Sequence, residues 1–228
     1  MSIIITERLQ ALDTIKLDKG EHSTFEDGHC AMEVVAWLAG EGHTDAPECA
    51  SRVLRNMTIG LNDAWDNGER QRLAPFLPRM VGTGNDGLDE RRSYLALDWM
   101  IRTYTPAWLD LAGHTKEAQE LRDLRRIVDL ATAEAAGPVV KAGNEVASAA
   151  ESAARSAAWS AARSAARSAA DQVLAPTVET LKASALELLE SMIKPEYSPQ
   201  VLAEHDEAIC SDASPRICDE CLAAGDPA

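Results

Sequence analysis

The sequence has few aromatic residues and too little positive charge for a basic surface. Aromatic side chains make up only 4% of its 228 residues, so the core has to be built from aliphatic and small side chains. Lys and Arg number 22 against 37 Asp and Glu, for a net charge of −15, which argues against nucleic-acid binding through a general basic surface. No run of about 18 apolar residues is present, so we expect no membrane-spanning helix.

The first residues also lack the features of a secretory signal. Met1–Arg8 does not have a basic segment followed by an apolar one, so we expect a cytoplasmic protein. Hydrophobic residues make up 46% of the chain, which is enough to bury a core and argues against disorder.

Apolar residues recur at helical spacing through most of the chain, and few segments alternate with a period of two. We therefore predict an all-α fold: a compact multi-helix bundle over residues 1–195, followed by a loosely ordered acidic tail over residues 196–228. The expected helical segments are 5–15, 23–40, 45–65, a bent segment at 69–80, 88–112, 115–137, 148–171 and 174–193.

Local signals set the expected boundaries of several of these helices. Ser23 and Glu26 have the spacing of a capping box, and Asp45–Glu48 contains an Asp, a Pro and a Glu suited to a first helical turn. Pro106 predicts a kink near Arg102. The loop at residues 82–87 has three glycines but neither dinucleotide nor P-loop spacing, so we interpret it as a connector.

Residues 148–171 consist of six consecutive Ser-Ala-Ala-x units. Alanine is the best helix former, so this repeat predicts a long helix. Its small residues would let other helices approach closely, with Trp159 filling one larger gap and Arg155, Arg163 and Arg167 pairing with acidic side chains of a neighbour. The alternative is an exposed alanine-rich spacer. It is less favourable, because isolated helices are only marginally stable in water.

Three of the five cysteines lie in the tail, close to a histidine. His205, Cys210, Cys218 and Cys221 form the pattern His-x4-Cys-x7-Cys-x2-Cys, which could hold one zinc ion in a tetrahedral site. The alternative is a set of free cytosolic thiols on a mobile tail.

Two further groups of residues are candidates for chemistry. His29 and Glu33 are four residues apart on one predicted helical face and could share a proton or bind a metal, with His43 beyond the next turn; a plain helix start is the alternative. Asp98 and Arg102 have the spacing of an intrahelical ion pair, beside Tyr104 and Trp108, which we expect in the core.

Three segments resemble a group of uncharacterised helical proteins of actinobacteria, their prophages and actinophages. These are His29–Glu41 (HCAMEVVAWLAGE), Arg102–Leu109 (RTYTPAWL) and the alanine repeat, and the resemblance covers roughly residues 12–193. The repeat is also similar in composition to alanine-rich helices of proteins assigned as immunity factors of toxin systems. The resemblance implies a helical phage or prophage accessory protein, placed in the host cytoplasm if phage-encoded, and supplies no catalytic residues.

We therefore expect a non-enzymatic protein that binds another protein, in host interference or immunity. No catalytic motif or obligatory cofactor is evident, and we expect no direct nucleic-acid or membrane partner, although a homo-oligomer is an option. One alternative is a metal-dependent enzyme that uses His29, Glu33 and Asp98, with His43 as a further ligand. Another is an acidic DNA mimic that inhibits a nucleic-acid enzyme.

Overall fold

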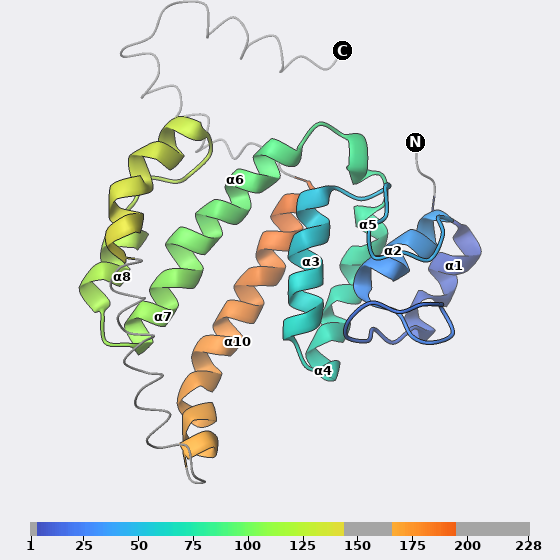
Figure 1. The fold of residues 1–228 in the computed structure, drawn as a ribbon, viewed down its shortest axis with the longest axis horizontal. Coiled ribbons are helices and arrows are strands. Elements are labelled where there is room, and N and C mark those ends of the chain that lie inside the picture. The colour runs from blue at the N-terminus through green and yellow to red at the C-terminus, as the bar shows by residue number, and fades with distance from the viewer. Residues whose placement is uncertain (1–3, 144–165, 195–228) are drawn as a thin grey trace, which may run out of the picture. The chain divides into compact units, whose positions relative to one another are not determined.

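The computed structural model describes residues 4–143 and 166–194, and every regular element in these ranges is helical (Figure 1). The predicted all-α fold is thereby confirmed. The elements are α1 (Thr6–Ala11), η1 (Leu12–Thr14), α2 (Ala31–Ala39), α3 (Arg52–Ala64), α4 (Asn67–Arg70), η2 (Gln71–Phe76), α5 (Leu77–Met80), η3 (Thr83–Asn85), α6 (Asp89–Trp99), η4 (Met100–Tyr104), α7 (Thr105–Leu111), α8 (Thr115–Arg122), a helix over residues 130–143, and α10 (Ala166–Ile193).

Helix α2 lies at the centre of the larger of two apolar clusters. Its side chains Met32, Val34, Val35 and Leu38 are completely withdrawn from solvent, and α1, α3 and α5 pack around it. A helix that is apolar on nearly every side is stable only when it is buried. Each of these side chains contributes on the order of 1.5–3 kcal/mol by leaving water.

The start of α2 differs from the prediction. The proposed capping box at Ser23 and Glu26 is wrong, because the helix begins at Ala31, after Cys30 as N-cap, and Glu33 supplies the carboxylate of the box. The Glu33 side chain accepts a hydrogen bond from the backbone N–H of Cys30 at 2.7 Å. Residues 15–30 form an irregular loop instead, whose conformation depends on contacts with distant residues.

Helix α3 also begins later than predicted, one residue after its N-cap Ser51 rather than at Asp45–Glu48. The Ser51 hydroxyl accepts from the backbone N–H groups at positions 53 and 54. The preceding segment stays irregular because the Glu41 carboxylate accepts from the N–H groups of Glu48 and Cys49, at 2.9 and 2.8 Å. A tertiary contact therefore overrides the local helix-start signal.

Short elements link α3 to α6. The bent segment predicted at 69–80 is confirmed, since Pro75 lies in the 3-10 helix η2 and Pro78 in the first turn of α5. The loop at residues 82–87 that follows connects α5 to α6, as expected. Gly84 is required there, because a Cβ atom at this position would lie 2.0 Å from the backbone oxygen of Glu48.

The helix predicted at 88–112 is present as α6, η4 and α7 in unbroken succession. The break expected near Arg102 takes the form of a π-helical turn at Met100–Tyr104. Pro106 explains it, because proline has no N–H to donate to the preceding turn. The Thr105 hydroxyl donates instead to the carbonyl of Met100, five residues earlier, at 2.8 Å.

The single helix expected at 115–137 is wrong, since residues 123–129 interrupt it between α8 and the helix at residues 130–143. The interruption is held by the Asp98 carboxylate, which accepts from the N–H of Ile127 at 2.8 Å, while the Ile127 side chain is buried. The Asp129 carboxylate then accepts from the N–H of Thr132 at 2.8 Å, as an N-cap for the next helix.

Helix α10 is longer at its start than predicted. We expected a separate helix after Ala175–Pro176, but α10 runs from Ala166 through Pro176 and ends at Ile193, just before Pro195, as predicted. The last alanine units thus continue into α10, consistent with the high helix propensity of alanine. The rest of the repeat, and the side chains of its arginines and of Trp159, lie outside what the structure describes.

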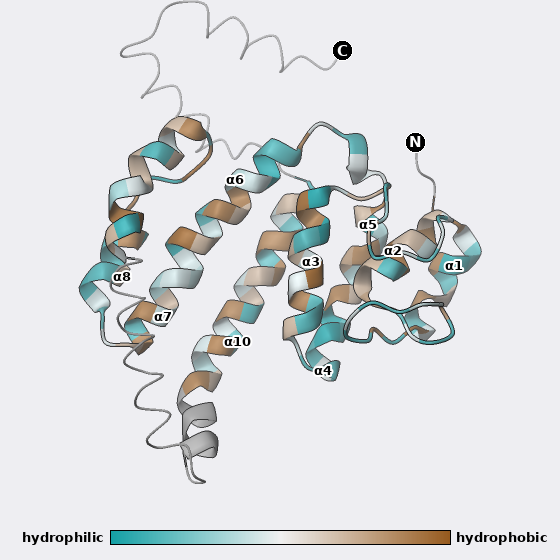
Figure 2. Ribbon diagram, viewed as in Figure 1, coloured by the Kyte–Doolittle hydropathy of each residue, from teal (hydrophilic) through white to brown (hydrophobic). Residues whose placement is uncertain are grey.

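Helices α3, α6 and α10 pack together, and Figure 2 shows apolar residues along all three. Arg92 of α6, completely buried, fixes the end of α10 by donating to the carbonyl of Met192 at 2.8 Å. The same guanidinium donates to the Asp86 carboxylate at 2.5 and 2.7 Å and holds the pKa of that carboxyl below its ordinary value. Among the described residues, no helix is both long and apolar enough to cross a bilayer.

Replacing Arg92 by Met is expected to lower the free energy of unfolding by about 3–5 kcal/mol, because it removes the guanidinium that neutralises Asp86 and donates to the Met192 carbonyl. Urea unfolding followed by circular dichroism measures the change. The control is Arg79→Met, which removes the exposed ion pair with Glu190 and is expected to cost no more than about 1 kcal/mol. Equal losses in the two variants would contradict the assigned role of Arg92.

Candidate functional site

The predicted zinc ligands His205, Cys210, Cys218 and Cys221 lie outside the described residues, so the tail site stays a prediction. Within residues 4–143 and 166–194, no group of three or more His, Cys, Asp or Glu side chains is arranged to hold a metal ion.

Glu33 is the centre of a polar cluster inside the larger apolar core. Its carboxylate is completely buried and accepts from the backbone N–H groups of His22 and Cys30, both at 2.7 Å. It also contacts two imidazoles: Nδ1 of His22 lies 2.9 Å from one carboxylate oxygen, and Nε2 of His43 lies 3.5 Å from the other. Both oxygens of the carboxylate therefore have partners.

The cluster joins two loops to α2. His22 belongs to the loop before the helix and His43 to the segment after it, and Nε2 of His43 also lies 3.0 Å from the backbone oxygen of His22. Gly28 packs directly on the His22 ring, since a Cβ atom there would come within 2.6 Å of it. Glu33 is thus the anchor that fixes residues 18–30 against the helix.

The structure does not assemble the proposed metal-dependent site from His29, Glu33, Asp98 and His43. Of these residues it brings Glu33 and His43 together, whereas the His29 ring stacks on Phe25 with centroids 4.3 Å apart. Asp98 belongs to another part of the fold, where it pairs with Arg102 and binds the N–H of Ile127. Sequence reasoning missed His22, because nothing in the spacing marks a loop residue eleven positions before Glu33 as its partner.

Electrostatics keep Glu33 ionised despite its burial. Burial alone raises the pKa of a carboxyl group, but the hydrogen bonds from the His22 and Cys30 backbone and from the His22 side chain, together with the field of His43, hold the pKa of Glu33 below its ordinary value. An ionised carboxylate with three hydrogen bonds and no solvent access is a structural anchor. It is poorly placed to take a proton from a substrate.

The two described cysteines are also structural. Cys30 and Cys49 are free and buried, and burial is the main cause that raises the pKa of each thiol to about 12. Neither is a thiolate near neutral pH, so neither is a nucleophile.

A different surface carries the strongest signal for interaction. Along α6, η4 and α7, Leu97, Met100, Tyr104, Trp108 and Leu111 follow one another at spacings of three or four residues, and we call this set the α6–α7 face. Leu97, Met100 and Leu111 are 38%, 44% and 36% exposed, although they are large apolar side chains. Grouped apolar exposure of this kind is typical of a binding surface.

The α6–α7 face lies between two buried faces of the same helical rod. Leu95, Ala96 and Trp99 pack against the larger cluster, while Ile101 and Leu109 belong to the smaller one, with α8. The face is therefore the side that the described part of the chain leaves to solvent.

Aromatic rings stiffen this face. Trp99 and Tyr104 have ring centroids 5.3 Å apart, and Tyr104 and Trp108 meet edge to face at 6.1 Å. Trp99 is anchored in turn, because its indole N–H donates to the Ser184 hydroxyl of α10 at 3.0 Å. The expected core positions of Tyr104 and Trp108 are corrected: both are only partly buried, and neither packs into the larger or the smaller apolar cluster.

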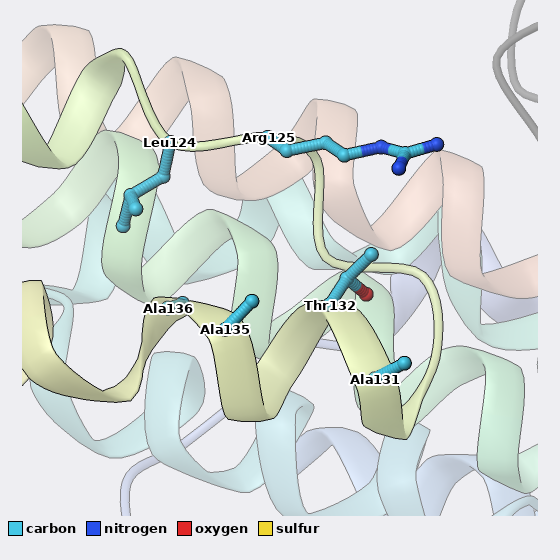
Figure 3. Close-up of a pocket in the computed structure, with 6 residues that line it drawn as sticks. All are labelled: Leu124, Arg125, Ala131, Thr132, Ala135 and Ala136. Atoms are coloured by element: carbon cyan, nitrogen blue, oxygen red, sulfur yellow. The ribbon is translucent and has the colours of Figure 1, made fainter. Parts of the chain in front are cut away.

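A shallow pocket of about 280 Å³ lies where residues 124–125 meet the helix at residues 130–143 (Figure 3). Its lining is mainly alanine and leucine, and the Thr132 hydroxyl is already engaged with Asp129 at 2.7 Å. Few polar groups are left to orient a ligand, so the pocket is a weak candidate site. The six lining residues are Leu124, Arg125, Ala131, Thr132, Ala135 and Ala136.

Comparison with protein-family models, with curated proteins and with solved structures finds no match for this chain.

Glu33→Gln is expected to destabilise the protein at neutral pH by about 2–4 kcal/mol, because a buried amide cannot accept every bond that the carboxylate accepts. The pH dependence is a second signature. A carboxyl whose pKa is lowered by folding contributes stability above its unfolded pKa, near 4.5, and loses it as the pH falls through the folded value. Urea unfolding between pH 7 and pH 3 should therefore bring the wild type and Glu33→Gln closer together. A constant difference over this range would contradict an ionised Glu33.

Cys30 and Cys49 are expected to resist iodoacetamide in the folded protein at pH 8, because their buried thiols stay protonated. Peptide mass spectrometry after labelling in buffer and in concentrated urea measures this directly. Rapid labelling of either residue without urea would show that its burial is wrong.

Proposed function

We propose that the protein acts without catalysis, by binding another protein through the α6–α7 face. The observation that carries the proposal is the row of exposed Leu97, Met100 and Leu111 beside the partly exposed rings of Tyr104 and Trp108. Trp and Tyr are enriched among the residues that dominate binding energy at interfaces, and rigid rings lose little conformational entropy when they are covered.

The hydrogen bonds made by the buried charged side chains support the same proposal. Glu33, Arg70 and Arg92 are the buried charged side chains among the described residues, and each holds backbone groups in place. Their donors and acceptors are spent on folding, so they are poorly suited to act on a substrate.

The sequence resemblance supplies the biological setting. Residues Arg102–Leu109, one of the segments similar to phage and prophage proteins of actinobacteria, contribute Tyr104 and Trp108 to the α6–α7 face. We therefore propose an accessory role in host interference or immunity, exerted on a host or toxin protein. The net charge of −15 favours partners that are not themselves strongly acidic.

The test is affinity capture from actinobacterial cells with the full-length protein, followed by measurement of the affinity for the captured partner. We expect one protein to bind the wild type, and the double variant Leu97→Asp/Met100→Asp to weaken binding by about 30-fold or more, because charges replace the two most exposed apolar side chains of the face.

The control is Leu9→Asp, which places one such charge on α1 at a leucine that is 42% exposed. It should leave binding unchanged. Undiminished binding by the double variant, with circular dichroism like that of the wild type, would refute the proposed surface. Binding that instead disappears steeply with added salt and ignores the double variant would favour the acidic DNA-mimic alternative.

A further inference from the structure

The described residues form two apolar clusters of very unequal size. The larger contains twenty buried residues from α2, α3, α5, α10 and neighbouring segments, whereas the smaller contains three, Leu109, Ala118 and Leu121. The smaller cluster joins α7, α8 and the helix at residues 130–143, and Gly143 packs on Leu121. Because local stability follows buried apolar contact, these three helices are expected to open more easily than the rest.

The joint between the clusters is the π turn η4. Ile101 within it belongs to the smaller cluster, and Trp99 immediately before it packs against the larger one. Pro106 removes one backbone hydrogen bond just after the turn, so the helical rod is weakest at this point.

Two unsatisfied donors also lie at this joint. Nε of Arg102 and the indole N–H of Trp108 are the buried side-chain polar atoms that have no hydrogen-bond partner in the described part of the chain. A buried donor without an acceptor costs free energy that solvation recovers. Opening at η4 therefore lets water solvate the two donors, which offsets part of the free energy that opening requires.

One side chain clasps the joint. The Asp98 carboxylate, on the last turn of α6, accepts from the backbone N–H of Ile127 at 2.8 Å and from the guanidinium of Arg102 at 3.3 Å. Arg102 in turn donates to the carbonyl of Arg122, at the end of α8, at 3.4 Å. Asp98 thus connects α6 to the end of α8 and to the segment after it, across the π turn.

We propose that η4 is a hinge, at which α7, α8 and the helix at residues 130–143 open as one unit from the larger cluster, and that Asp98 is the clasp that holds it closed. Opening breaks the Asp98 contacts and the packing of α7 on α10, and leaves α2 and α3 intact. The hinge does not depend on the proposed function, since it concerns the free protein.

Hydrogen–deuterium exchange of the full-length protein tests the hinge. In the wild type, amides of α7 and α8 are expected to exchange at least about tenfold faster, relative to their intrinsic rates, than those of α2 and α3. Asp98→Ala should accelerate exchange over residues 105–143 by about a further tenfold and leave α2 and α3 within about twofold of the wild type.

Two more variants make the result specific. Asp98→Asn keeps one acceptor oxygen and should give a smaller increase than Asp98→Ala. The control Glu190→Ala removes an exposed ion pair on α10 and should leave exchange over residues 105–143 unchanged. Equal protection of both clusters in the wild type, or an Asp98→Ala effect that is absent or spread evenly over the chain, would overturn the proposal.

Discussion

The N-terminal half of the molecule depends on one buried carboxylate. Helix α2 is surrounded by apolar side chains, yet it carries Glu33 at a position from which no solvent can be reached. An ionised group there has to be satisfied by the protein itself, because an isolated buried charge costs far more than one residue can contribute to folding. The polar atoms of His22, Cys30 and His43 meet this need, and the loops that carry them are thereby fixed on the helix.

Two buried arginines donate hydrogen bonds to unpaired backbone carbonyls at the ends of helices. Arg70 donates to the carbonyls of Asn62 and Trp65 at the end of α3, at 2.5 and 2.7 Å, and Arg92 donates to Met192 at the end of α10. The last carbonyls of a helix have no partner within it and carry partial negative charge. A guanidinium has several donors in a plane, so one side chain satisfies the helix end and a nearby residue together.

Much of the fold could be predicted, because helix spacing is a local property. The rod at 88–112 and the end of α10 before Pro195 follow from apolar period and proline position. The starts of α2 and α3 were predicted wrongly, because Glu33 and Glu41 bind backbone groups that the Ser23 and Asp45 signals ignore. The candidate site was harder to predict than the fold, because His22 contacts Glu33 only through the conformation of the loop that carries it. The partial exposure of Tyr104 and Trp108 could not be predicted from spacing either, because the same apolar period fits a core face and a solvent face.

The π turn also fixes the phase between the two halves of this rod. An α-helix advances about 100° per residue, so the wider turn at η4 shifts every side chain after it around the axis. A π turn holds about one residue more than an α turn, so removal of a single residue from Met100–Tyr104 would let the rod run as a regular α-helix and leave α7 close to its present orientation about the axis. Leu109 would then stay in its cluster. At this point the rod can therefore lose one residue of chain length without turning its buried side chains toward solvent.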